Sequence, residues 1–370
     1  MSFDPNRPYN ELPGLPPEMD LETPAVLRAC IGARAALAEL RMAGLLIPNQ
    51  TVLINSIPLL EAQASSEIEN IVTTTDKLFR FAKGDGSDTD AATKETLRYR
   101  AALSMGYRSL ADRPLATRTA VEICRIIKAS DIDLRATPGT RLVNDNTGQV
   151  IYTPPEGAAI IRDKLADWER FLHAEGTLDP LIRMAVMHYQ FEAIHPFIDG
   201  NGRTGRILNL LYLVERGLLD IPVLYLSGHI IQNKRHYYDL LLNVTTKGDW
   251  QGLVLFMIEA VETTARWSTR KIMEIRQLLE DTAVRMRADT PKIYSRDFAE
   301  LIFVNPYCRI ADVVEAGIAR RQTASTYLKA LSEAGILEER IAGRERLYIN
   351  PRLLSLLSDR RFTEADAGMR

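Results

Sequence analysis

Apolar residues recur at spacings of three and four along most of the chain, which is the period of an α-helix. After a Pro-rich, acidic arm at residues 1–20, this pattern predicts a mainly helical protein. Residues 83–92 interrupt it as a polar loop, with Thr93 expected to cap the next helix. The expected helices cover 26–46, 51–82 with an interruption near Pro58, 93–111, 115–129, 156–175, 179–194, 202–216, 231–246 and 249–280.

Two segments depart from the helical period. In residues 141–155, β-prone runs flank Asn144–Gly148 and end at Pro154-Pro155, a pattern that predicts a small β-hairpin. After residue 290 the order becomes helix, turn with Gly317, helix, then two short strands around Ala342-Gly343. This order predicts a winged helix-turn-helix at the C-terminal end.

The second helix of this C-terminal module would be the recognition helix if the module binds DNA. The side chains that could contact DNA are Arg320, Arg321, Gln322, Thr323, Ser325, Tyr327 and Lys329 on the helix, and Arg340, Arg344 and Arg346 on the wing. Residues 290–360 contain 11 Lys and Arg against 9 Asp and Glu, a net charge of +2. Because a DNA-binding surface is usually more basic, DNA binding and protein docking both stay open.

Composition narrows the class of protein. The chain of 370 residues has a formal net charge of −2 and is 46% hydrophobic, values typical of an ordinary globular protein. No run approaches the ~20 apolar residues of a membrane span, and no signal peptide is visible, so no membrane contact is expected. Three widely separated cysteines form no disulfide framework and favour a reducing, cytoplasmic setting.

The densest chemistry lies in 195-HPFIDGNGRTGR-206. Its glycines allow a sharp turn and a close approach of backbone to a ligand. The loop leads into a helix, and a helix N-terminus with its unpaired N–H groups favours a phosphate. Arg203 and Arg206 lie on one face of that helix and match phosphate oxygens in a fork.

Two further residues complete this site. Asp199 beside phosphates suggests Mg²⁺, which binds through one or two carboxylates together with substrate phosphates. The ordinary pKa of a histidine lies near neutrality, so His195 suits proton transfer. The residues therefore predict a Mg-nucleotide site with a histidine base.

The same segment resembles the signature of the Fic family, H-P-F-x-[D/E]-G-N-G-R-x-x-R, at every fixed position. The resemblance implies transfer of AMP from ATP to a hydroxyl of a target protein or of the chain itself. By resemblance, His195 is the catalytic base and Asp199 holds Mg²⁺. The ATP-binding residues that it implies in the motif are Gly200, Asn201, Gly202, Arg203, Thr204, Gly205 and Arg206.

Two neighbouring segments resemble further parts of the family. The hairpin, with Val150, Ile151 and Tyr152, is similar to the Fic flap, which is thought to pair with an extended target segment. The segment 227-SGHIIQNKRHYYDLLL-242 is similar to the one whose tandem tyrosines approach the adenine. Tyr237 and Tyr238 point to different sides of a helix, so at most one is expected to face the base.

The stretch 65-SSEIEN-70 resembles the inhibitory motif of Fic proteins, [S/T]-x-x-x-E-[G/N], through Ser65, Glu69 and Asn70. In the family the glutamate reaches the second motif arginine, here Arg206. The resemblance implies that Glu69 removes the clamp on the γ-phosphate and autoinhibits the enzyme. In some members the same glutamate instead helps to remove AMP.

The sequence thus predicts a mainly α protein with a Fic-type helical core, a small β-hairpin flap, an N-terminal helical region and a C-terminal winged helix-turn-helix. The expected regions are 1–112 with the inhibitory motif, 113–280 as the catalytic core, and 288–355 as the winged helix. The leading function is protein adenylylation with ATP and Mg²⁺. Removal of AMP and a DNA-binding regulator that senses nucleotide are the alternatives, and a homodimer is compatible with both.

Overall fold

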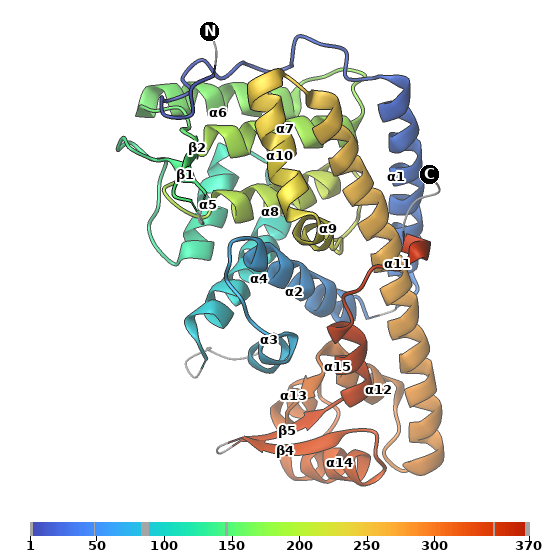
Figure 1. Cartoon of the computed structure of the whole chain (residues 1–370). Helices are drawn as coiled ribbons and strands as arrows, with labels where there is room; N and C mark the ends of the chain where they lie inside the picture. Colours follow the sequence, from blue (N-terminus) through green and yellow to red (C-terminus); the bar gives the residue numbers. More distant parts are fainter. Residues whose placement is uncertain (1–2, 48, 83–88, 145–146, 343–344, 367–370) are drawn as a thin grey trace.

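The computed structural model describes residues 3–47, 49–82, 89–144, 147–342 and 345–366, and its fold is mainly helical as predicted (Figure 1). The N-terminal arm runs in extended and turn conformation to Thr23, whose hydroxyl accepts from Val26 N and caps the first helix. The N-terminal helices are α1 (Pro24–Leu45), α2 (Thr51–Ile68), α3 (Thr75–Phe81) and α4 (Ala91–Ser109).

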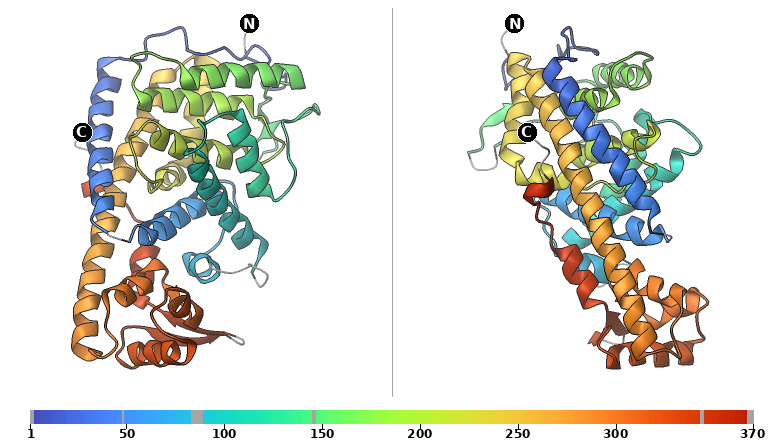
Figure 2. Two further views of the ribbon diagram at one scale, coloured as in Figure 1. Left: turned by 180° about the vertical axis from the view of Figure 1, so that it is seen from behind. Right: turned by 90° about the vertical axis from the view of Figure 1, so that its right-hand side faces the viewer.

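The longest element is α11 (Trp250–Asp289), a helix of 40 residues. It continues nine residues beyond the expected end at 280 and joins the helical core to the C-terminal module (Figure 1). Helix α1 packs along its first half, and the right-hand view of Figure 2 shows the two lying side by side on the surface. The extension exists because apolar positions such as Ile275, Leu279 and Met286 continue the helical period and are buried.

The core contains α5 (Thr117–Lys128), β1 (Leu142–Val143), β2 (Val150–Tyr152), α6 (Ala158–His173), α7 (Pro180–Ile194), α8 (Asn201–Glu215), α9 (Leu226–Gln232) and α10 (Lys234–Lys247). Helices α7 and α8 lie at its centre, since nearly all their side chains are buried. Strands β1 and β2 pair antiparallel, with Leu142 opposite Tyr152, which confirms the predicted hairpin. The single helix expected over 231–246 is two helices that meet at Asn233.

Two local predictions in the N-terminal region were wrong. Helix α2 runs without a break through Pro58, although a proline inside a helix costs about 3 kcal/mol. Burial of almost the whole of α2 between neighbouring elements offsets that cost. The cap of α4 is Asp90, whose carboxylate accepts from the N–H of Thr93, so Thr93 is the capped residue. Residues 83–88 of the expected loop lie outside the described residues.

The C-terminal module contains the helix–turn–helix and the two-stranded hairpin that the pattern predicted. Its elements are α12 (Arg296–Val304), β3 (Tyr307–Cys308), α13 (Ile310–Glu315), α14 (Arg321–Glu333), β4 (Glu338–Ala342), β5 (Glu345–Ile349) and α15 (Pro351–Ser358), followed by a 3-10 turn at Glu364–Asp366. The strands form an antiparallel sheet in the order β3-β5-β4. The expected turn at Gly343 and the wing residue Arg344 lie outside the described residues.

The C-terminal module rests against the N-terminal helices. Arg360 Nη1 lies 3.1 Å from Glu67 Oε2 at the end of α2, and the Tyr307 hydroxyl donates to Asp76 on α3. Asn305 Nδ2 donates to the carbonyl of Phe79 at 3.2 Å. Helix α2 therefore lies between the core and the C-terminal module (Figures 1 and 2).

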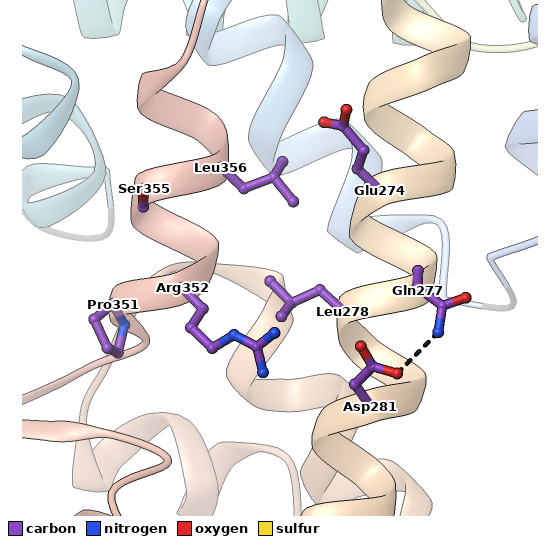
Figure 3. A pocket seen from close by; sticks show the side chains of 8 residues that line it. All are labelled: Glu274, Gln277, Leu278, Asp281, Pro351, Arg352, Ser355 and Leu356. Atoms are coloured by element: carbon purple, nitrogen blue, oxygen red, sulfur yellow. Dashed lines mark hydrogen bonds between the residues drawn. The ribbon is translucent and has the colours of Figure 1, made fainter.

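A groove of about 610 Å³ opens between α11 and α15 (Figure 3). Leu278 and Leu356 point toward each other across it, and Gln277 donates to Asp281 at 2.8 Å along its edge. None of the residues of the 195–206 motif lines this groove, so it is separate from the predicted site. Among the residues described, no helix combines the length and apolar character that crossing a bilayer requires.

Candidate functional site

The motif forms the connection between the two central helices. His195 ends α7 in the left-handed conformation, with φ 49°, and its N–H donates to the carbonyl of Phe191 at 3.0 Å. A left-handed non-glycine residue is strained and persists only where its surroundings fix it. Here the fixing group is Arg135, a buried side chain that the sequence analysis did not single out.

Arg135 ties the histidine to the flap. Its Nε donates to the carbonyl of His195 at 2.7 Å, and its Nη2 donates to the carbonyl of Ile194 at 3.1 Å. The same Nη2 also donates to the carbonyl of Pro155, directly after the hairpin. A cation over the last carbonyls of a helix complements their partial negative charge. Arg135 therefore fixes the position of His195 relative to the flap.

The loop between His195 and α8 is held closed by hydrogen bonds of the Asn201 side chain. Asn201 Oδ1 accepts from Phe197 N, and Asn201 Nδ2 donates to Phe197 O, both at 2.8 Å. Gly200 caps α8 with φ 88°, a conformation that glycine adopts without strain. The Asn201 side chain thus stabilises the loop. The groups left to bind a ligand at the start of α8 are backbone N–H groups.

The side chain of Arg206 meets the segment 65–70 that the sequence predicted. Its Nε donates to Ser65 Oγ at 2.8 Å, and its Nη2 donates to Ser65 O at 3.0 Å and to Glu69 Oε1 at 2.6 Å. Arg206 is 1% exposed. Burial by itself would lower the pKa of Arg206, but the nearby carboxylates, Glu69 first, outweigh burial and raise it. The guanidinium is therefore a fixed buried cation whose contact in this structure is Glu69.

Glu69 also covers the start of α8. A Cβ added at Gly202 would collide with Glu69 Oε1, so the carboxylate lies directly on the helix N-terminus. Glu69 is the C-cap residue directly after Ile68, the last residue of α2, and Asn70 follows in the left-handed conformation with φ 60°. Asparagine tolerates this conformation better than other non-glycine residues, which explains the Asn or Gly at this motif position.

Asp199 and Arg203 belong to a charge network that the sequence analysis did not foresee. Lys128 Nζ lies 2.5 Å from Asp199 Oδ2 and 3.0 Å from Glu95 Oε1. Arg203 Nη1 donates to the same Glu95 oxygen at 2.6 Å and lies 3.7 Å from Asp199 through Nη2. Burial opposes ionisation of Asp199, but the Lys128 ammonium outweighs it and lowers the pKa of the Asp199 carboxyl. Arg203 and Arg206 thus start on one helix face but reach different partners.

His195 has the electrostatics of a neutral base. Burial, assisted by the positive charge of Arg135, lowers the pKa of the His195 imidazole to about 4. Its Nδ1 is a buried polar atom without a hydrogen-bond partner among the described residues. The imidazole is consequently neutral at neutral pH, and a neutral imidazole can accept a proton.

A second carboxyl, Glu192, lies beside the same cluster. It is directed at Gly205, where an added Cβ would collide with Glu192 Oε1, and that oxygen has no partner within the described residues. Burial raises the pKa of Glu192 to about 7, with Arg206 opposing the shift. Thr204 is fully buried, and the absence of a side chain at Gly205 leaves room for the Glu192 carboxyl beside α8.

The adjacent residues Tyr237 and Tyr238 differ in exposure, as expected for neighbouring positions that point to different sides of a helix. Tyr237 is buried and its hydroxyl lies 2.7 Å from His188 Nε2, whereas Tyr238 is 43% exposed. Tyr238 is therefore the residue of the pair that a ligand can reach. The rings of His229 and His236 pack against Phe256.

The flap places one of its three predicted residues in the interior. Tyr152 is buried, and its hydroxyl donates to the carbonyl of Ala193 at 2.8 Å, two residues before His195. Ile151 is exposed and Val150 is partly exposed. The N-terminal arm continues this edge, since Tyr9 N donates to the carbonyl of Thr153 at 3.0 Å. Val150 and Ile151 are thus the flap residues that face outward.

The donor set for a metal is small. Across the described ranges, no group of three or more His, Cys, Asp and Glu side chains could hold a metal ion by itself. Asp199 remains as a single, partly exposed carboxylate at the helix start. This fits a cation such as Mg²⁺ that takes one protein carboxylate and completes its shell with phosphate oxygens and water.

Three family models match consecutive parts of the chain. Residues 27–108 match the Fic/DOC family N-terminal model and residues 117–213 match the Fic/DOC family model. Residues 278–353 match the C-terminal domain of SoFic-like protein adenylyltransferases. The motif at 195–206 lies inside the second match, and the segment 65–70 lies inside the first.

Curated relatives resemble part of the chain. A protein adenylyltransferase Fic of Drosophila willistoni is 30% identical over 152 residues, 40% of this chain and 28% of that protein. The protein adenylyltransferase fic-1 of Caenorhabditis briggsae is 32% identical over 112 residues, 30% of this chain and 21% of that protein. The matched region thus spans about a quarter of the length of these relatives.

Solved structures share the fold. A Fic family protein from Desulfovibrio desulfuricans aligns with a TM-score of 0.56 at 20% identity, over 90% of this chain and 98% of the other. A Fic domain containing signaling protein from Bacteroides thetaiotaomicron aligns with a TM-score of 0.51 at 18% identity, over 66% and 97%. These likenesses concern the fold. The family models over residues 27–108, 117–213 and 278–353 show that the chain belongs to the Fic/DOC family and carries a SoFic-like C-terminal domain.

Proposed function

We propose that this chain transfers AMP from Mg²⁺-bound ATP to a hydroxyl side chain of a protein, and that Glu69 restrains the reaction. The observation that carries the proposal is the arrangement of the 195–206 segment. A neutral His195 stands at one end of a loop whose other end is a helix N-terminus with two buried arginines. This arrangement suits proton removal from an acceptor beside a bound polyphosphate.

The proposed step is a nucleophilic displacement at the α-phosphorus of ATP. The acceptor hydroxyl gives its proton to His195, its oxygen forms a bond to the α-phosphorus, and the bond from that phosphorus to the leaving pyrophosphate breaks. Asp199 would hold Mg²⁺, whose charge offsets that of the phosphates. The N–H groups at Gly200–Gly202 and the guanidinium groups of Arg203 and Arg206 would bind phosphate oxygens.

Glu69 would restrain the reaction because it competes with the phosphates of ATP for the Arg206 guanidinium and for the N-terminus of α8. With Glu69 on Arg206 and over Gly202, a phosphate group meets a carboxylate where it needs a positive charge. Like charges at such close range repel, so the outer phosphates bind poorly or in another pose. In the proposed division of the chain, residues 1–112 carry this brake, 113–280 carry the chemistry, and 288–355 form the winged-helix domain.

The test is label transfer to protein from two forms of ATP, one labelled at the α-phosphate and one at the γ-phosphate. Adenylylation predicts protein label from the first form and none from the second, and loss of label in His195→Ala. Label from the γ-phosphate alone would mean phosphorylation and would contradict the proposal. Release of AMP from a pre-modified protein, without forward transfer, would assign removal of AMP instead.

A further inference from the structure

Helix α1 has two apolar faces, and the chain itself covers only one. Its buried side, which includes Cys30, Leu37 and Leu40, packs on α11. The opposite side is also apolar, and we define the α1 stripe as six residues: Leu27, Ile31, Ala35, Ala38 and Met42 on this side, and Leu46, the C-cap residue directly after the helix. All six are exposed; Ile31 is 70% exposed and Met42 62%. A contiguous apolar stripe that stays exposed marks a surface that another molecule can cover.

The spacing within the α1 stripe is symmetric. Successive members are separated by four, four, three, four and four residues, so the stripe reads the same from either end of the helix. The side-chain sizes are symmetric too, since large residues lie at both ends and the two alanines lie in the middle. The right-hand view of Figure 2 shows α1 running along the outside of the molecule, where a second helix has access.

We propose that the α1 stripe is the contact surface of a homodimer in which α1 of one chain packs antiparallel on α1 of a second copy. An antiparallel pair with a two-fold axis between Ala35 and Ala38 places Ile31 against Met42 of the second copy. Ala35 then faces Ala38 of the second copy, where small side chains let the two helices approach closely. Such a contact is isologous, because the same patch serves both chains.

The charges beside the stripe permit this contact. Arg34 Nε lies 2.7 Å from Asp179 Oδ2 at the start of α7, and Arg41 Nη2 lies 2.8 Å from Asp220 Oδ1. These ion pairs within each chain neutralise the two arginines on one flank. The other flank carries the exposed residues Arg28 and Glu39, which have opposite charges, so the two-fold axis does not bring two uncompensated positive flanks together.

The area is sufficient for a dimer of modest affinity. The exposed apolar surface of the stripe with the adjacent Leu45 is roughly 600 Å² per chain, so two chains would bury on the order of 1,200 Å², the lower end of stable interfaces. A membrane is the weaker occupant, because helices that lie on membranes carry a strongly charged face opposite the apolar one, whereas the face of α1 opposite the stripe is apolar and packs on α11. The second copy is the occupant that matches the symmetry.

The first test is the mass of the full-length chain in solution over a range of concentrations, measured by sedimentation or light scattering. The expected result is reversible growth from 41.6 kDa toward twice that mass. Ile31→Glu and Met42→Glu should each abolish the dimer, since each places a charge against an apolar residue of the second copy. The control Val284→Glu changes a residue that is 61% exposed on α11, outside the stripe, and should leave the dimer intact.

The second test fixes the direction of the helices. The three native cysteines are buried, so introduced thiols on the stripe can be cross-linked selectively. A mixture of Ile31→Cys and Met42→Cys proteins should cross-link, whereas each protein alone should not, because like positions lie about 16 Å apart along the antiparallel axis. A wild-type chain that stays monomeric, a dimer that survives Ile31→Glu, or cross-linking of Ile31→Cys with itself would overturn the proposal.

Discussion

The carboxylate of Glu69 lies 2.6 Å from Nη2 of Arg206 although 137 residues separate the two in the chain. The contact joins the end of α2 to the second turn of α8, and Glu69 Oε1 also covers the backbone at Gly202. One side chain thus engages both groups that an incoming phosphate would need. If this contact is the brake, every change that weakens it should raise the rate of AMP transfer.

Ser65 provides a graded test of this relationship. Its hydroxyl accepts from Arg206 Nε at 2.8 Å and helps to hold the guanidinium beside Glu69. Ser65→Ala should weaken the contact by about 1 kcal/mol and raise the basal rate roughly fivefold. The neighbouring Ser66 is equally buried, but its hydroxyl has no partner among the described atoms, so Ser66→Ala is the matched control. Equal rates in the two variants would speak against the brake.

Lys128 should compete with the metal for Asp199. Its ammonium lies 2.5 Å from the Asp199 carboxylate, in the position of a counter-ion that Mg²⁺ must displace or share. Lys128→Met should therefore lower the Mg²⁺ concentration for half-maximal activity by at least about threefold. Arg118→Met on the same helix, whose partner is Glu122, serves as the control. A higher Mg²⁺ requirement in Lys128→Met would show that Lys128 assists metal or phosphate binding instead.

The pH profile should reveal the low basicity of His195. The pKa of His195 is lowered to about 4, so the neutral form that accepts a proton predominates throughout pH 5 to 8. The term of kcat/KM that depends on His195 should be flat over this range and fall about tenfold per pH unit only below pH 4. A decline that begins near pH 6.5 would mean that His195 titrates like an ordinary histidine.

Arg135 should act on His195 in two ways. It holds the carbonyl of His195 at 2.7 Å, and its charge helps to keep the imidazole neutral. Arg135→Met should lower kcat by roughly tenfold to a hundredfold through misplacement of the base. It should also move the acid limb of the profile upward, because the imidazolium loses a repelling neighbour.

Arg135→Lys separates the two effects. It keeps the charge and loses the forked contacts with the carbonyls of Ile194 and Pro155, so the acid limb should stay low while kcat falls. A loss of activity in both variants without any shift of the acid limb would assign Arg135 a structural role only. Thermal unfolding of each variant, measured in parallel, accounts for any loss of folded protein.

The sequence was informative where one short segment carries both the residues and their geometry. The 195–206 motif predicted a turn followed by a helix start, and α8 begins at Asn201 as the glycines require. The hairpin, the helical core and the helix–turn–helix at the C-terminal end also follow from local patterns. The pairing of Glu69 with Arg206 was accessible only through the resemblance, since no spacing rule links α2 to α8.

Other residues of the site could not be found this way. Arg135, Lys128, Glu95 and Glu192 carry no local signature, and each gains its role from partners distant in sequence or across a packed helix. Tyr237 and Tyr238 could be separated only by knowing which side of α10 faces the core. The predicted interruption at Pro58 was wrong because the rule against proline in helices does not take tertiary packing into account, and α2 is buried on almost every side.

The most direct test of the account compares protein label from α-phosphate-labelled ATP in wild type, Glu69→Gly and the double variant Glu69→Gly with His195→Ala. Removal of one charge-assisted contact predicts about tenfold to hundredfold more label in Glu69→Gly than in wild type. The double variant should give none. Equal label in wild type and Glu69→Gly, or label that persists without His195, would contradict the account.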